Sequence, residues 1–123
     1  MTRLQSIELL GFRDNLHVAH WQAPRKTNEH ATLGDLYEAV LGKVDELTEL
    51  AIARDGGVEF PQSQTISIIN RVEYPDLLAG GLLILTEIRA TLKAGADDDM
   101  LNIIADLAAA IRRAAYKLEI VLP

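Results

Sequence analysis

Hydrophobic residues recur along this chain every three to four positions, the spacing that places side chains on one face of an α-helix. The pattern is clearest over residues 32–54 and after the acidic run at residues 97–99. In the latter stretch the apolar positions are Met100, Ile104, Leu107, Ile111, Ala114, Leu118 and Val121. Residues 4–21 are apolar on nearly every face, which predicts a helix covered on more than one side. Together with residues 75–93, the pattern predicts four helices.

Residues with strong preferences for helix ends delimit these segments. Thr32, followed by Asp35, is predicted to cap the second helix. Pro75 suits the first turn of the third helix, and Gly95 suits its end. Two adjacent glycines at 80–81 each cost that helix about 1 kcal/mol relative to alanine. They indicate close approach by another backbone or, alternatively, a local kink.

The longest predicted link, residues 55–74, joins the second and third helices. A helix of twenty residues is about 30 Å long, whereas twenty extended residues reach about 66 Å. The link can therefore return along the whole bundle, so that these two helices run parallel. Residues 64–70 within it are predicted to form a short helix or strand. We predict a single all-α domain over residues 1–123, a four-helix bundle with one long crossover.

The composition agrees with a small aliphatic bundle. Of 123 residues, 49% are hydrophobic but only 5% are aromatic, so the core must consist of aliphatic side chains. The chain has no cysteine, which excludes disulfides and thiolate metal sites. No apolar stretch is long enough to span a bilayer, and the first twenty residues do not have the pattern of a signal peptide. We therefore expect a cytoplasmic protein without a membrane partner.

The net charge of −6 disfavours nucleic acid as a partner, because an acidic chain repels phosphates unless its basic residues are segregated. An acidic chain of this kind is better suited to bind cations than nucleic acid. Helical geometry places Glu38, Asp45 and Glu49 at roughly 120–160° from the first residue of the apolar stripe on residues 32–54. Leu41 and Ile52 lie between these carboxylates and the stripe, where the bundle's own core would not cover them. This strip predicts a partner subunit.

Candidate metal ligands gather in the first half of the chain. The three histidines, His17, His20 and His30, all lie within residues 17–30, close in sequence to the acidic face. Imidazole combined with two or three carboxylates suits Fe(II), Mn(II) or Zn(II). Alternatively, the acidic face is an ordinary solvated face and His30 a surface residue. The sequence has no Glu-x-x-His motif for a site inside the bundle, and Glu87 and Asp106 are interpreted as surface charges.

The stretch His17-Val18-Ala19-His20-Trp21, followed by His30 and by Val44-Asp45-Glu46-Leu47-Thr48-Glu49, resembles the Dps-like mini-ferritins. The resemblance covers about residues 10–54, and the predicted helix number and crossover are those of ferritin-like proteins. It implies a ferritin-like bundle that binds iron and oxidises Fe(II) with peroxide or oxygen. It further implies a homo-oligomer, at least a dimer, in which the metal site is shared between two subunits. The implied ligands are His20, His30, Asp45 and Glu49.

The sequence departs from the family pattern at several positions. The step from His20 to His30 is two residues shorter than usual. Gly34 stands where the family often has an acidic residue, and Leu50 follows Glu49 where members usually have arginine.

These departures bring in His17 and Asp35 as further candidate ligands, and Glu38 is a third because it shares a helix face with Asp45 and Glu49. Iron is the expected metal, with Zn²⁺ or Mn²⁺ as alternatives. Two other functions stay open. One is a non-catalytic ferritin-like structural or assembly protein, such as a virion-associated component of a phage particle. The other is a zinc protein that uses the three histidines and leaves an open coordination position.

Overall fold

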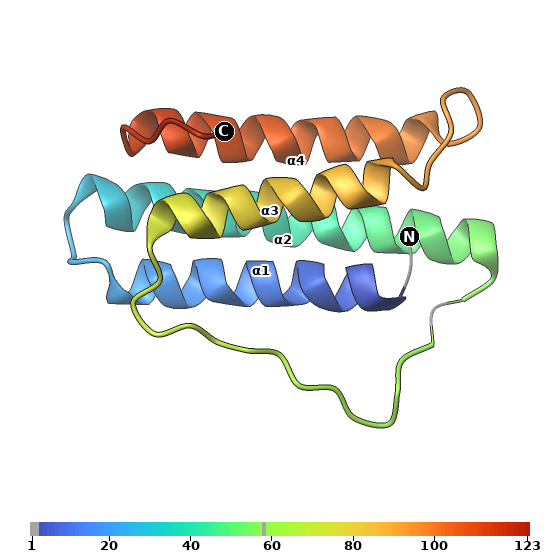
Figure 1. Ribbon diagram of the computed structural model, residues 1–123, viewed down its shortest axis with the longest axis horizontal. Helices are drawn as coiled ribbons and strands as arrows, with labels where there is room; N and C mark the ends of the chain where they lie inside the picture. Colours follow the sequence, from blue (N-terminus) through green and yellow to red (C-terminus); the bar gives the residue numbers. More distant parts are fainter. Residues whose placement is uncertain (1–2, 58) are drawn as a thin grey trace.

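The computed structural model describes residues 3–57 and 59–123, and this part of the chain folds into four α-helices without a strand (Figure 1). The helices are α1 (Arg3–Gln22), α2 (Asn28–Asp55), α3 (Tyr74–Arg89) and α4 (Asp98–Lys117). The predicted all-α class and four-helix bundle are thereby confirmed. No helix in the described ranges is long and apolar enough to cross a membrane.

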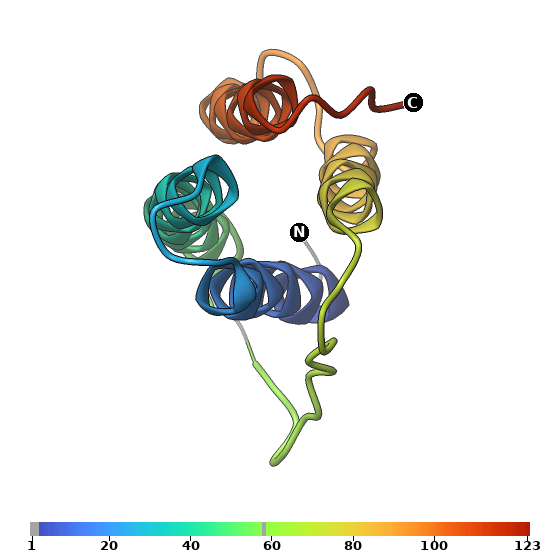
Figure 2. The ribbon, with the colours of Figure 1, turned by 90° about the vertical axis from the view of Figure 1, so that its left-hand side faces the viewer.

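The helices form two antiparallel hairpins, α1 with α2 and α3 with α4 (Figure 1). We call residues 56–73 the crossover segment. Its described residues, 56–57 and 59–73, return along the bundle past α1, so that α2 and α3 run parallel. Both α1 and α4 pack against α2 and α3. The view along the bundle accordingly places the parallel pair α2 and α3 on a diagonal (Figure 2).

Aliphatic side chains from all four helices fill the bundle, as the composition predicts. Fully buried examples, one from each helix, are Leu16, Leu33, Leu78 and Ile104. The ring of Phe12 packs where a side chain on Gly81 would stand, since a Cβ there would overlap with Phe12 Cζ. The close approach predicted at residues 80–81 is therefore made by an aromatic side chain rather than by a backbone, and α3 continues through it.

The predicted start of the second helix is wrong. α2 begins at Asn28, four residues before the predicted cap. Thr27 caps it instead, because its hydroxyl oxygen accepts the His30 N–H at 3.2 Å. Thr32 is buried inside the helix. His30 is therefore a residue of the first helical turn and not of the preceding loop.

Two predicted helix ends toward the C-terminus are also wrong. α3 ends at Arg89, and Gly95 lies in the following loop with a φ of 88°. α4 ends at Lys117. Val121 therefore lies outside the helical seam and is 96% exposed.

The crossover segment has no regular helix or strand in its described residues, so the short element predicted at 64–70 is absent there. Side chains of α1 hold the segment instead. Buried Asn15 donates from Nδ2 to the Ser67 carbonyl at 3.0 Å and accepts the Ile69 N–H at 2.8 Å. Gln22 accepts the Arg71 N–H at 2.8 Å. These bonds satisfy backbone groups that a helix would pair within itself and that a strand would pair with its neighbour.

Candidate metal centre

His20, in the last turn of α1, lies against His30, in the first turn of α2, with ring centroids 4.0 Å apart. Each ring binds the backbone of the other residue. His20 Nδ1 donates to the His30 carbonyl at 2.7 Å, and His30 Nδ1 donates to the His20 carbonyl at 2.9 Å. His30 Nδ1 is also 3.2 Å from the carbonyl of Ala23. The fold thus brings two of the predicted ligands together, and we call them the histidine pair.

These hydrogen bonds determine which ring nitrogens remain available. A carbonyl oxygen only accepts, so Nδ1 of each imidazole must carry a proton. In the neutral ring Nε2 then keeps a free lone pair, which is the form of histidine that binds a metal. Metal-binding histidines commonly donate their second nitrogen to a carbonyl or carboxylate, which fixes the orientation of the ring. Both rings of the histidine pair have this arrangement.

The end of α1 explains why the His20 carbonyl needs a side-chain donor. In a continuing helix this oxygen would accept the N–H of the residue four positions later. That residue is Pro24, which has no N–H. His30 supplies the missing donor through its Nδ1–H at the end of α1. Pro24 therefore both ends the helix and frees the carbonyl that His30 binds.

His17 lies beside the histidine pair but makes different contacts. Its ring stacks on Tyr37 at a centroid distance of 3.9 Å and lies 4.1 Å from the ring of Trp21. The distance to the His20 centroid is 6.5 Å. Trp21 forms the outer layer of this aromatic contact and is 65% exposed. His17 thus packs between aromatic rings of α1 and α2.

Asp45 and Glu49 are exposed and lie further along α2. About 22 Å of helix separates His30 from Asp45 at a rise of 1.5 Å per residue. One copy of the chain therefore does not bring these carboxylates to its own histidine pair. Within the described residues, no group of three or more histidine, aspartate or glutamate side chains is placed to hold a metal ion. Asp45 lines a hollow of about 520 Å³ together with Leu41 and Phe60, which are exposed.

The remaining candidate ligands are dispersed. Asp35 is exposed and lines a small hollow of about 190 Å³ between α2 and α4, where Arg113 and Lys117 also lie. Glu38 is exposed on α2. Asp106 forms an exposed ion pair with Lys43 at 3.4 Å, in agreement with its interpretation as a surface charge.

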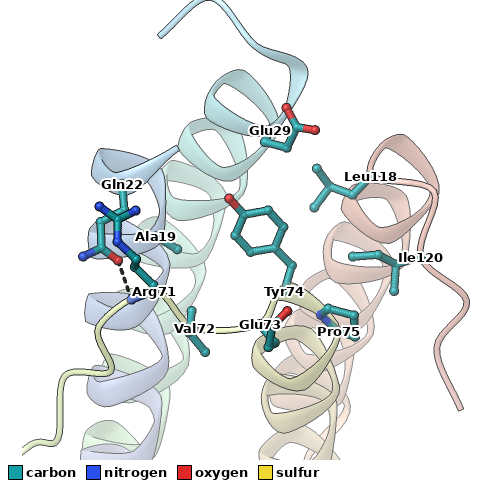
Figure 3. Close-up of a pocket in the computed structure, with 10 residues that line it drawn as sticks. All are labelled: Ala19, Gln22, Glu29, Arg71, Val72, Glu73, Tyr74, Pro75, Leu118 and Ile120. Atoms are coloured by element: carbon teal, nitrogen blue, oxygen red, sulfur yellow. Dashed lines mark hydrogen bonds between the residues drawn. The ribbon is translucent and has the colours of Figure 1, made fainter. Parts of the chain in front are cut away.

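A cleft that sequence analysis did not find opens where α1, α2, α3 and the C-terminal tail meet (Figure 3). Its volume is about 330 Å³. The ring of Tyr74 lies in it, between Ala19 on one side and Leu118 on the other (Figure 3). Burial, and then the nearby carboxylates of Glu29 and Glu73, raise the pKa of Tyr74. No pattern in the sequence indicates this cleft, because four separate segments form it.

Comparison of the chain with protein-family models, with curated proteins and with solved structures finds no match.

Proposed function

We propose that this protein binds iron at a site shared between two copies of the chain, as in a ferritin-like protein. His20 and His30 of one copy and Asp45 and Glu49 of the other are the proposed ligands. The observation that carries the proposal is the reciprocal bonding of the histidine pair, which leaves both Nε2 atoms free. Two imidazoles and two carboxylates suit Fe(II), and also Mn(II) or Zn(II).

Two features support a site between copies. The carboxylates and the histidine pair are separated by about 22 Å along one rigid helix. The α2 face that carries Asp45 also exposes Leu41 and Ile52, and Phe60 borders the same hollow. Grouped exposed apolar side chains that are bordered by polar residues are typical of protein–protein interfaces. A two-fold dimer would repeat every contact and create two equivalent sites.

Iron is the proposed substrate as well as the bound ion. The carboxylates would neutralise the cation and favour the ferric state, and the histidines would set affinity and geometry. In the oxidation we propose, two Fe(II) ions give one electron each to a peroxide, which takes up two protons and leaves as two waters.

A mixing experiment tests whether the site is shared. We prepare one variant with His20→Ala and His30→Ala and a second with Asp45→Asn and Glu49→Gln. Each alone is expected to lose Fe(II) binding under anaerobic conditions. When the two variants are unfolded together in equal amounts and refolded, about half of the dimers are mixed. Each mixed dimer has one intact site of two, so about a quarter of the wild-type Fe(II)-binding capacity should return.

The matched control carries Glu59→Gln and Glu87→Gln, which remove the same charge from exposed positions of the described chain. It is expected to bind Fe(II) like the wild type. Binding that persists in both ligand variants contradicts the proposed ligands. Binding lost in each variant but not regained on mixing contradicts a site between copies.

A metal-free assembly role is the second candidate function. It is favoured by the crossover segment, which exposes Phe60, Ile68 and Ile69 at 47%, 50% and 51%. A wild-type protein that forms oligomers but takes up no Fe(II) would support this role. Uptake of about one Fe(II) per chain would exclude it as the sole function.

A further inference from the structure

Gly34 lies directly beneath the ring of His20. A Cβ built on Gly34 would stand 2.7 Å from His20 Cε1, 2.9 Å from Nδ1 and 3.4 Å from Nε2. Carbon atoms in proteins do not approach so closely, so any side chain at this position must move the ring. Gly42, further along the same helix, has no atom within 4 Å of its Cβ position. Of these two glycines of α2, only Gly34 has such a close contact.

The position of Gly34 relative to His30 explains the contact. In an α-helix the carbonyl of one residue points toward the residue four positions later. The carbonyl of His30 therefore lies beside Gly34 on the helix surface. A carbonyl oxygen has two lone pairs, so it can accept from a side chain in addition to its helical partner. The His20 ring reaches this oxygen across the space left by the missing Cβ.

We propose that Gly34 is a positioning residue for His20. Without a Cβ, it lets the ring lie against α2 and donate Nδ1–H to the His30 carbonyl, which keeps the proton off Nε2. The effect on metal binding rests on the function proposed above. The effect on the ring itself does not, because the hydrogen bond forms without a metal.

The first measurement uses metal-free protein. Long-range ¹H–¹⁵N NMR correlations report which nitrogen of each histidine carries the proton at a pH where the rings are neutral, and the three histidines are assigned by single His→Ala variants. In the wild type we expect His20 and His30 with the proton on Nδ1. In Gly34→Ala we expect His20 to lose this form, while His30 keeps it. Gly42→Ala is the matched control and should give the wild-type spectrum.

The second measurement is a Co²⁺ titration followed by the visible absorption of the bound ion. Loss of a partner that orients a metal-binding histidine weakens metal binding by about tenfold to a hundredfold. Gly34→Ala should show a loss in this range. Gly80→Ala should show none, because Gly80 lies on α3 and has no atom within 4 Å of its Cβ position. In a His20→Ala background the ring is gone, so Gly34→Ala should have no further effect on Co²⁺ binding.

The two readouts separate the possible failures. If Gly34→Ala leaves His20 protonated on Nδ1, the positioning role is overturned, whatever the metal data show. If the wild type binds neither Co²⁺ nor Fe(II) but the proton moves as expected, the proposed function fails and the positioning role stands. A His30 ring that changes as much as His20 would indicate general disruption and would also overturn the specific role of Gly34.

Discussion

Two residues without reactive side chains, Pro24 and Gly34, determine how the histidine pair is held. Pro24 withholds the N–H that the His20 carbonyl would otherwise accept, which leaves this oxygen to His30. Gly34 leaves the space through which the His20 ring reaches the His30 carbonyl. The ring of His20 thus occupies the space that a side chain at position 34 would take.

His17 is expected to be dispensable for metal binding. Its ring packs between Tyr37 and Trp21, so His17→Ala removes aromatic contacts worth about 1 kcal/mol of folding free energy. A Co²⁺ titration should show affinity within about threefold of the wild type, since the hydrogen bonds that orient His20 and His30 do not involve His17. The same titration on His20→Ala should show a loss of tenfold or more.

A loss of Co²⁺ affinity in His17→Ala as large as that in His20→Ala would make His17 a ligand. It would also favour the arrangement of three histidines around zinc. Thermal unfolding of both variants provides the control, because each removes one ring from the same region of the bundle.

At the scale of elements, local patterns predicted the helices but not all of their ends. Thr27 and Thr32 are both suitable caps, and the sequence favoured Thr32 because Asp35 follows it. The structure uses Thr27, since α1 stops at Gln22 and the short turn brings the chain directly into α2. Gly95 was wrongly predicted to end the third helix, and Val121 was wrongly placed in the fourth. Turn geometry, rather than the hydrophobic period, determines where α3 and α4 end.

The crossover segment and the closely packed glycines lie beyond what periodicity can predict. Asn15 holds two backbone groups that are more than fifty residues away in the chain. The contact of Gly34 with His20 likewise depends on how two helices pack. The spacing and composition of the sequence do not determine which backbone carbonyl a histidine ring binds. The pairing of His20 with His30 could therefore be expected only through the resemblance of the motif.

The junction between α3 and α4 contains a carboxylate that links three segments. Asp97 is nearly buried, accepts the Lys93 N–H at 2.9 Å and accepts from Arg54 Nη1 at 3.1 Å. The Lys93 hydrogen bond first, and then Arg54, lower the pKa of Asp97. The ion pair fastens the end of α2 to the start of α4. The sequence pattern marked residues 97–99 only as an acidic run before the last predicted helix.

Asp97 should make stability depend on pH in the acidic range. Because its pKa is lower in the folded state, its contribution is fully present above the ordinary carboxyl pKa of about 4 and is lost as the pH falls through the lower folded value. Asp97→Asn should therefore lower the melting temperature at pH 7. The difference from the wild type should shrink as the pH falls below about 4.

Thermal unfolding at several pH values checks this, with Glu87→Gln as an exposed control that should follow the wild type throughout. A difference between Asp97→Asn and the wild type that is equally large at pH 2 and pH 7 would show that shape, and not charge, makes Asp97 stabilising.

At the scale of the whole molecule, one copy of the chain carries both parts of the proposed site but does not bring them together. The histidine pair stands where α1 meets α2, while Asp45 and Glu49 lie on the outer face of α2 beside Leu41. A second copy that covers this face would bury Leu41 and Phe60 and could place its histidines against the carboxylates. Metal binding and association of two copies would then be linked, so that each favours the other.

This linkage predicts that metal affinity depends on protein concentration. Diluting the wild type below the dissociation constant of the dimer should weaken Co²⁺ binding, and adding Co²⁺ should restore the dimer in analytical ultracentrifugation. Leu41→Lys places a charge in the proposed interface and should give a monomer with at least about tenfold weaker binding. Leu83→Lys is the matched control, because Leu83 is exposed on α3, away from α2. A Leu41→Lys monomer that binds Co²⁺ like the wild type would mean that one copy completes the site alone.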